Sequence, residues 1–236
     1  MKAFGISDLH LSAVGDKPMD VFGPEWAGHA DKLAANWRRL VAPDDLVLIP
    51  GDLSWAMRLD EARPDLDFIG ALPGVKYFIR GNHDHWLSGP TRVRAVLAPT
   101  MTLIRFDAAV ECGVGICGVR GWPWPGHADY LPERDEVHWK RAVARLRLSL
   151  DALSRLSWEV AVAMFHYAPR PLERDTELTE MVREAGVRWC VYGHVHGPDA
   201  AAALEGEVDG VTYRCVSADK VGFAPALLFE HPAPRS

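Results

Sequence analysis

The stretch RGNHDHW, residues 80–86, follows the apolar run VKYFIR (75–80), which is typical of a β-strand. Gly81 suits a turn out of this strand, because glycine adopts backbone angles that strain other residues. Asn82 to His85 then combine an amide, two imidazoles and a carboxylate. A polar surface turn is the simplest interpretation, but such a turn does not require two imidazoles, an amide and a carboxylate together.

The composition is that of an ordinary globular protein. Of the 236 residues, 48% are hydrophobic and 25% are charged, which is enough for a sizeable core. The length alone is compatible with one large domain or two small ones. The formal net charge of -6 argues against nonspecific nucleic-acid binding through a basic surface, although metal ions can still create a local positive site.

Targeting and cysteine patterns point to the cytoplasm. The start, MKAFGISDLHLS, lacks the basic and apolar regions of a signal peptide, and no window approaches the roughly 18 apolar residues of a membrane span. The four cysteines form no C-x-x-C pair, and three lie in apolar runs, which favours buried thiols over disulfides or zinc. They are Cys112, Cys117, Cys190 and Cys215.

Nine short apolar runs predict β-strands. Several are apolar almost throughout, as expected for strands that are covered on both faces. The predicted strands span residues 2–7, 45–50, 75–80, 102–106, 114–119, 159–165, 188–192, 211–217 and 225–230.

Helical patterns lie between these strands. Apolar residues at spacings of three and four predict helices over 25–41, 60–72, 133–156 and 176–186. The alternation predicts an α/β fold, a layered sandwich of two mixed β-sheets flanked by helices. Because there is no repeat, low-complexity tract or linker, we expect a single domain over residues 1–236.

Polar clusters follow five of the predicted strands. Ligands and catalytic groups in layered α/β folds gather at the carboxyl ends of strands, so we expect these clusters to meet at one edge. They are Asp8-x-His10, Gly51-Asp52, Gly81-Asn82-His83-Asp84, His166 and Gly193-His194-x-His196.

Each cluster alone is weak, but the set has a clear chemistry. Gly51-Asp52 is an ordinary turn dipeptide, whereas His194 and His196 project to the same side of an extended backbone. Imidazoles with carboxylates suit Mn, Fe or Zn, while Mg and Ca prefer shells of oxygen alone. No cysteine joins the set, which excludes a Cys-rich structural zinc site.

In this order, D-x-H, G-D, G-N-H-D, a lone H and G-H-x-H resemble the signature of the calcineurin-like metallophosphoesterases. The resemblance covers residues 8–196, and no element of the motif is missing. The stretches KPMDVFG (17–23) and LIPGDLSWAM (48–57) look like an uncharacterised bacterial branch of this superfamily, the predicted phosphohydrolases.

The resemblance implies two divalent transition-metal ions, with Mn²⁺ first and Fe, Zn or Ni as alternatives. Asp8, His10 and His196 would hold one ion. Asn82, His166 and His194 would hold the other, and Asp52 would bridge the two.

The resemblance also implies roles for His83 and Asp84. A hydroxide shared by the two ions would attack phosphorus, and His83 would assist the leaving group while Asp84 orients its imidazole. His85 and Trp86 fall outside the shared motif, and either could be part of a pocket wall or plain packing.

For the substrate we expect a small phosphodiester or a nucleotide. The alternatives are a phosphomonoesterase or protein phosphatase, and a non-catalytic metal-binding scaffold, which should have lost ligands that are present here. The segment 121–134 could shape the pocket, with Trp122, Trp124 or Tyr130 stacking on a base or simply packing on the core. Nucleic acid and membranes are not expected partners, and the oligomeric state stays open.

Overall fold

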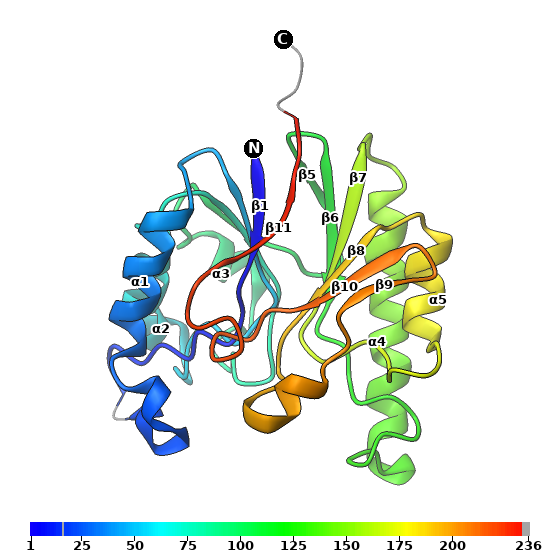
Figure 1. The fold of residues 1–236 in the computed structure, drawn as a ribbon, viewed down its shortest axis with the longest axis horizontal. Helices are drawn as coiled ribbons and strands as arrows, with labels where there is room; N and C mark the ends of the chain where they lie inside the picture. The colour runs from blue at the N-terminus through cyan, green and yellow to red at the C-terminus, as the bar shows by residue number, and fades with distance from the viewer. Residues whose placement is uncertain (16, 233–236) are drawn as a thin grey trace.

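The computed structural model describes residues 1–15 and 17–232, which form two β-sheets packed face to face with helices outside (Figure 1). One sheet has the strand order β11-β1-β2-β3-β4 and the other has the order β5-β6-β7-β8-β10-β9. This arrangement confirms the predicted sandwich of two mixed sheets flanked by helices.

The first sheet is parallel except for its edge strand β11. Register pairs Ala3 with Leu46 and Leu46 with Val75, while Lys2 lies opposite Glu230 of the antiparallel β11. The bounds are β1 Lys2–Gly5, β2 Leu46–Ile49, β3 Val75–Phe78, β4 Met101–Leu103 and β11 Ala226–Glu230.

The second sheet has a parallel centre with antiparallel strands at both edges, β5 and β9. The bounds are β5 Ala109–Glu111, β6 Val114–Val119, β7 Val160–Phe165, β8 Trp189–Tyr192, β9 Gly206–Val208 and β10 Val211–Cys215.

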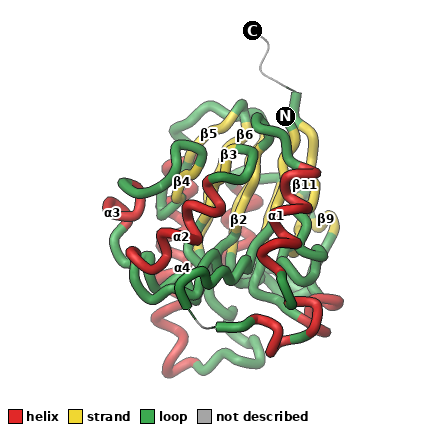
Figure 2. The backbone as a smooth tube through the Cα atoms, turned by 90° about the vertical axis from the view of Figure 1, so that its left-hand side faces the viewer, coloured by secondary structure: helices red, strands yellow, loops and turns green. Residues whose placement is uncertain are grey.

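Helices cover the outer face of each sheet. Figure 2 shows α1 and α2 in front of the first sheet, and Figure 1 shows α4 and α5 beyond the second. The bounds are α1 His29–Leu40, α2 Leu59–Gly70, α3 Pro90–Arg94, α4 Pro132–Leu153 and α5 Glu177–Glu184. Short 3-10 turns span Met19–Phe22, Pro24–Trp26 and Gly197–Ala202.

Three apolar layers hold these elements together: one lies between the sheets, and one lies between each sheet and its helices. The central strands are therefore buried on both faces. In β2, Leu46 and Leu48 face the layer between the sheets, where Val162 and Met164 of β7 also lie. Val47 and Ile49 face the opposite way, towards α1 and α2. A third layer packs α4 and α5 against the second sheet.

The predicted elements are present with shifted ends. The helix predicted from residue 25 begins at His29, because Gly28 has a φ of 62° and interrupts the helical backbone. Two three-residue strands, β5 and β9, and the short helix α3 were not predicted. None of the helices in the described part of the chain is long and apolar enough to cross a membrane.

Candidate metal centre

The carboxyl ends of β1, β2, β3, β7 and β8 meet at the lower edge of the molecule as drawn in Figure 1. These five strands run parallel within their sheets, so the loops that follow them converge on one place. The loops carry all seven of the predicted metal ligands.

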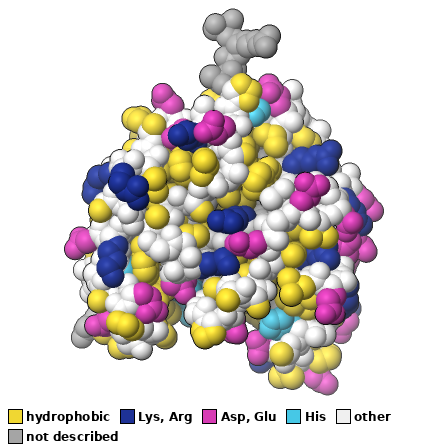
Figure 3. Space-filling view, viewed as in Figure 1, with side chains coloured by type: hydrophobic (Ala, Val, Ile, Leu, Met, Phe, Trp, Pro, Cys, Tyr) yellow, Lys and Arg dark blue, Asp and Glu magenta, His cyan; other side chains and the backbone are white. Residues whose placement is uncertain are grey.

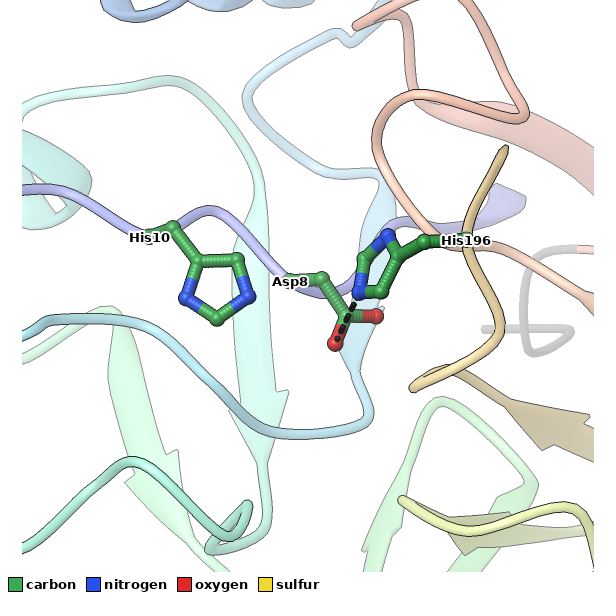
Figure 4. A group of neighbouring side chains, drawn as sticks. All are labelled: Asp8, His10 and His196. Atoms are coloured by element: carbon green, nitrogen blue, oxygen red, sulfur yellow. Dashed lines mark ion pairs between the residues drawn. The ribbon is translucent and has the colours of Figure 1, made fainter. Parts of the chain in front are cut away.

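Asp8, His10 and His196 form one compact group, drawn in Figure 4. Their ligand atoms lie within 4.8 Å of one another, and His196 Nε2 is 3.5 Å from Asp8 Oδ1. Both Asp8 and His10 come from the loop after β1, whereas His196 follows β8 of the other sheet. Docking of the two sheets therefore creates this group.

A second group joins Asp52 and His166 to the same Asp8. His166 Nε2 lies 3.4 Å from Asp52 Oδ2 and 2.5 Å from Asn82 Oδ1. Asp52 Oδ2 is also 3.8 Å from His10 Nε2, so its carboxylate lies between the two groups. This position is compatible with a bridging role, which together with the rest of the ligand assignment stays a prediction.

His194 is close to the second group without belonging to its tight cluster. Its ring centroid lies 5.0 Å from that of His166, and its backbone N–H donates to Asp8 Oδ2 at 2.9 Å. Tyr167 packs against the other side, with 4.2 Å between ring centroids.

Four of the seven predicted ligands have backbone angles that L-residues rarely adopt. The φ values are 57° for Asp8, 45° for His10, 54° for Asp52 and 70° for His194. Such conformations cost about 1–3 kcal/mol each and persist where the surrounding structure imposes them. Their concentration here is typical of a functional site.

The residues present fit a bound metal. Asp8 Oδ1 and His10 Nδ1 are buried and have no hydrogen-bond partner among the described residues, which is costly unless a further ligand completes them. Imidazole, carboxylate and amide donors together match the transition metals rather than Mg²⁺ or Ca²⁺.

The pKa values of the site reflect burial and close carboxylates. Burial lowers the pKa of His10 and of His194 to about 4, so both are neutral at pH 7, the form that binds metal. Burial also acts to lower the pKa of His166 and His196, but nearby carboxylates outweigh it. Asp52 raises the pKa of His166 to about 8, and Asp219 with Asp8 raises that of His196 to about 10.

The hydrogen bonds that the described residues make to Asp84 come from backbone N–H groups and from Trp86, not from the imidazole of His83 that the sequence interpretation assigned to it. Asp84 is fully buried, and Oδ2 accepts the backbone N–H groups of Asp52 and Gly81, both at 2.8 Å. Oδ1 accepts the backbone N–H of Leu53 and the indole N–H of Trp86. Asp84 therefore fixes the two ligand loops to each other, and Trp86 is buried packing.

Gly81 is required by close approach rather than by its backbone angle, which corrects the sequence interpretation. Its φ is not in the left-handed region, but a Cβ here would lie 2.0 Å from Asp52 Oδ1. Only glycine therefore lets the loop after β3 reach the carboxylate of Asp52.

His83 lies beside the ligands. Its backbone N–H donates to Asp52 Oδ1 at 2.8 Å, and its ring lies 4.2 Å from that of Trp55 and 5.6 Å from that of His10. Burial lowers its pKa, and the half-buried ring lines the cavity next to the ligands. His85, two residues on, is exposed.

Asp219 is a site residue that the sequence did not reveal. Its Oδ1 lies 2.8 Å from Nδ1 of His196, and Oδ2 accepts the N–H of Gly197 at 3.0 Å. A carboxylate on the outer nitrogen of a metal-binding histidine fixes the ring and increases its basicity. Asp219 belongs to no motif, so only the fold could identify it.

An open cavity of about 380 Å³ adjoins these side chains, and its wall is largely apolar. Met19, Phe22, Trp26 and Trp55 line it, and Trp55 stacks on His10 with 4.7 Å between ring centroids. No arginine or lysine is among the described residues that line the cavity, although Lys17 lies over the Trp55 ring from outside.

The segment 121–134 does not contribute to this cavity. Trp122, Trp124 and Tyr130 pack against the core of the second sheet, and Trp122 stacks on His138 at 4.4 Å. The packing alternative for these aromatic residues is thus the one that the structure supports, and Trp26 and Trp55 hold the positions beside the ligands.

Known proteins with a similar structure include three solved structures. These three are similar to the chain at 13–18% identity, which shows a shared fold. A protein of unknown function, AQ665 of Aquifex aeolicus, matches with 15% identity and a TM-score of 0.52, covering 96% of this chain and 95% of that one. The phosphopantetheinyl hydrolase of Mycobacterium tuberculosis matches with 18% identity and a TM-score of 0.57, covering 98% and 96%. TT1561 of Thermus thermophilus matches with 13% identity and a TM-score of 0.53, covering 82% and 81%.

No curated protein matches the sequence. The model of one protein family, described as calcineurin-like phosphoesterase, matches residues 1–198 and thus the whole span of the ligand motifs. The chain therefore belongs to the calcineurin-like phosphoesterase family, and the groups at its strand ends that could hold a metal ion fit a metal-dependent phosphoesterase.

Proposed function

We propose that this phosphoesterase hydrolyses a small phosphodiester whose ester group is flat or apolar. One observation carries the proposal: the cavity at the metal centre has aromatic and apolar walls, and no arginine or lysine is among its described lining residues. A diester carries one negative charge on its phosphate, whereas a monoester at neutral pH approaches two. The wall thus offers the extra charge of a monoester no arginine or lysine.

The seven predicted ligands would hold two ions, for which we propose Mn²⁺ first, with Fe, Zn and Ni as alternatives. When bound, the ions would supply positive charge for the phosphoryl oxygens and acidify water for attack on phosphorus. Asp219 holds the ring of His196 at this centre, and Asp84 fixes the loops of Asp52 and Asn82.

His83 is suited to act on the departing oxygen. Its ring lines the cavity between the ligands and Trp55, and its backbone N–H is tied to Asp52. A histidine in this position can donate a hydrogen bond or a proton to the ester oxygen as the P–O bond breaks. Trp55 and Phe22 would then contact the organic part of the same leaving group.

The test is a substrate comparison on protein reconstituted separately with Mn, Ni, Zn and Mg. We expect kcat/KM for bis-p-nitrophenyl phosphate to exceed that for p-nitrophenyl phosphate. Higher kcat/KM for the monoester with every metal would overturn the diester assignment and favour the phosphomonoesterase. A screen of cyclic and linear nucleotides should follow, with phosphopantetheine esters included because one structural neighbour is named for that group.

The aromatic wall can be tested separately with Trp55→Ala and Phe22→Ala. Loss of stacking should raise KM for aryl and nucleotide diesters by about 5- to 150-fold, since stacking on one aromatic ring is worth about 1–3 kcal/mol. A methyl ester should be affected much less. Met57→Ala, at an exposed apolar position that does not line the cavity, is a matched control.

Three further assignments stay proposals. The packing of both sheets around one apolar layer supports a single domain over residues 1–236. Three buried, unpaired cysteines support a location in the reducing cytoplasm. The full set of ligands argues against a non-catalytic scaffold.

A further inference from the structure

A second cavity, of about 240 Å³, lies between the ends of β3, β4 and β6 and the helix α4. Five arginines line it, and no aspartate or glutamate is among its described lining residues. In a protein with 26 basic and 32 acidic residues, a cavity with this lining is unusual. The five are Arg80, Arg105, Arg120, Arg141 and Arg145.

The five guanidinium groups of this cavity, which we call the arginine cavity, form no ion pair with any carboxylate in the described part of the chain. The arginines that form ion pairs in the described chain are others, namely Arg58, Arg94, Arg134, Arg170, Arg183 and Arg214. On the face drawn in Figure 3, by contrast, cationic and anionic side chains are interspersed.

Two of these half-buried arginines each have one buried nitrogen that is not hydrogen-bonded. Nε of Arg80 and Nη1 of Arg105 are shielded from solvent, and neither has a hydrogen-bond partner in the described part of the chain. Buried donors of a charged group are costly to leave unpaired. Burial and then the charges of Arg80 and Arg145 lower the pKa of Arg105, which agrees with like charges facing each other.

The scaffold holds the arginines in place without neutralising them. Arg80, Arg105 and Arg120 each follow the end of a strand, and Arg141 and Arg145 lie one turn apart on α4. Aromatic rings supply the contacts: Arg120 lies over Trp122 at 4.8 Å, and Arg145 over Phe106 at 4.8 Å. Stacked guanidinium groups keep their N–H donors available for an oxyanion.

We propose that the arginine cavity binds a phosphate group of a small anionic ligand. Guanidinium groups bind phosphate oxygens through paired N–H donors, which gives strong and oriented hydrogen bonds. The volume is below the about 300–1,000 Å³ of pockets for drug-sized ligands, so a phosphate or diphosphate group fits better than a whole nucleotide.

The arginine cavity adjoins the metal centre through the backbone. Arg80 lies two residues before Asn82, and the carbonyl of Arg120 accepts the N–H groups of His166 and Tyr167 at 3.0 and 2.9 Å. The phosphate can therefore belong either to the far end of a substrate or to a separate ion. Binding itself does not depend on the proposed reaction, so it can be tested independently.

The experiment is calorimetric titration of the full chain with inorganic phosphate and with pyrophosphate, in the presence of Mn²⁺ and after its removal by chelation. The expected result is a binding event that survives metal removal. Arg105→Gln and the double variant R141Q/R145Q should weaken it by about tenfold or more, because each loses charge-assisted hydrogen bonds.

The double variant R147Q/R155Q is the matched control, since it removes the same charge at exposed positions outside the cavity. Absence of binding at millimolar anion in metal-free protein would overturn the proposal. Equal affinity in the cavity and control variants would overturn it as well. Thermal melting without anion tests whether the variants are folded, and the cavity variants should have melting temperatures no lower than that of the control.

Kinetics then separate the two sources of phosphate. If the group belongs to the substrate, R141Q/R145Q should raise KM about tenfold for a diester that carries a second phosphate, because the titration predicts the same loss of affinity. The KM for a simple diester should stay unchanged. If it is a separate ion, added phosphate should alter the turnover of both diesters in wild type and not in the variant. Failure of every diester to react would contradict the proposed function while leaving the titration result valid.

Discussion

The metal centre and the arginine cavity lie at the same ends of the same two sheets, yet their charged side chains are arranged in opposite ways. At the metal centre, carboxylates and imidazoles are interleaved, and Asp8 alone has three histidines nearby. In the arginine cavity, positive groups face each other with no carboxylate among the described lining residues. The first region is largely balanced by its own residues, whereas the second has no carboxylate among its described lining residues to balance its arginines.

The difference suits the two regions to different kinds of ligand. A cation fits where carboxylate and imidazole atoms already converge, and only a few atoms, such as Asp8 Oδ1, lack partners among the described residues. An anion fits where donors converge without acceptors. Variants that remove one group from each region should therefore have effects of different size and, for stability, of opposite sign.

The largest effect is expected for Asp52→Ala. Because Asp52 Oδ2 lies between His10 and His166, loss of this carboxylate should release both metals. The value of kcat/KM should then fall by more than about 10³-fold, because bound metals stabilise the charge of the transition state by several kcal/mol. Asn82→Ala should lose mainly one ion. Metal content per chain, measured by elemental analysis, checks both variants, and equal content in the two would contradict the bridging position of Asp52.

The next effect concerns His83, which lines the cavity without being a predicted ligand. His83→Ala should keep both metals and reduce turnover by about 10²–10⁴-fold, the usual range for general acid catalysis. The reduction should be greater for an alkyl or ribose leaving group than for p-nitrophenolate, which departs without a proton. His85→Ala, at the exposed neighbour, is the control. Loss of metal from His83→Ala would assign it to the ligands instead.

A smaller effect is expected for Asp219→Asn, which keeps the shape of the carboxylate but removes its charge from His196. Changes of this kind cost about 10–100-fold in metal affinity or activity. Metal titration should show the weakening at one of the two ions. Asp199→Asn, on the exposed 3-10 turn nearby, should match wild type. Comparable weakening in both variants would remove Asp219 from the site.

The smallest effect, and the one of opposite sign, is expected for Arg145→Gln. Removal of one of several facing cations should raise the free energy of unfolding without anion by up to about 1 kcal/mol, the scale of a partly exposed charge interaction. Arg147→Gln on the same helix should change it less. Chemical denaturation at low salt measures both, and a clear destabilisation by Arg145→Gln would mean that the cavity is already neutralised.

Much of the fold could be predicted because local patterns determine it. Runs such as LVLI of β2 are apolar on both faces, and stripes such as those of α4 place one face on a sheet. β5 and β9 were missed because three residues carry too little pattern to distinguish a strand from a loop. The end of β4 was overestimated, since Phe106 has a φ of 66° and cannot continue a strand.

In the candidate site, too, the residues that belong to local sequence patterns could be predicted and the others could not. The predicted ligands follow strands in recognisable pairs such as Asp8-x-His10, so their meeting could be anticipated from strand direction alone. Asp219 and the five cavity arginines are spread over several elements, with only Arg141 and Arg145 sharing α4, and form no motif. The role of Asp84 depends on which backbone N–H groups it reaches, and no spacing in the sequence encodes that.

The pairing of β1 with β11 bears on how the protein matures, because Lys2 near the start of the chain lies opposite Glu230 near its end. Of the predicted ligands, four precede residue 100, and His166, His194 and His196 come from the second sheet. A chain emerging from the ribosome therefore holds an incomplete ligand set until β8 has been synthesised and the sheets have docked. Stable metal uptake should accordingly be post-translational, and metal content should report how many chains have reached the native state.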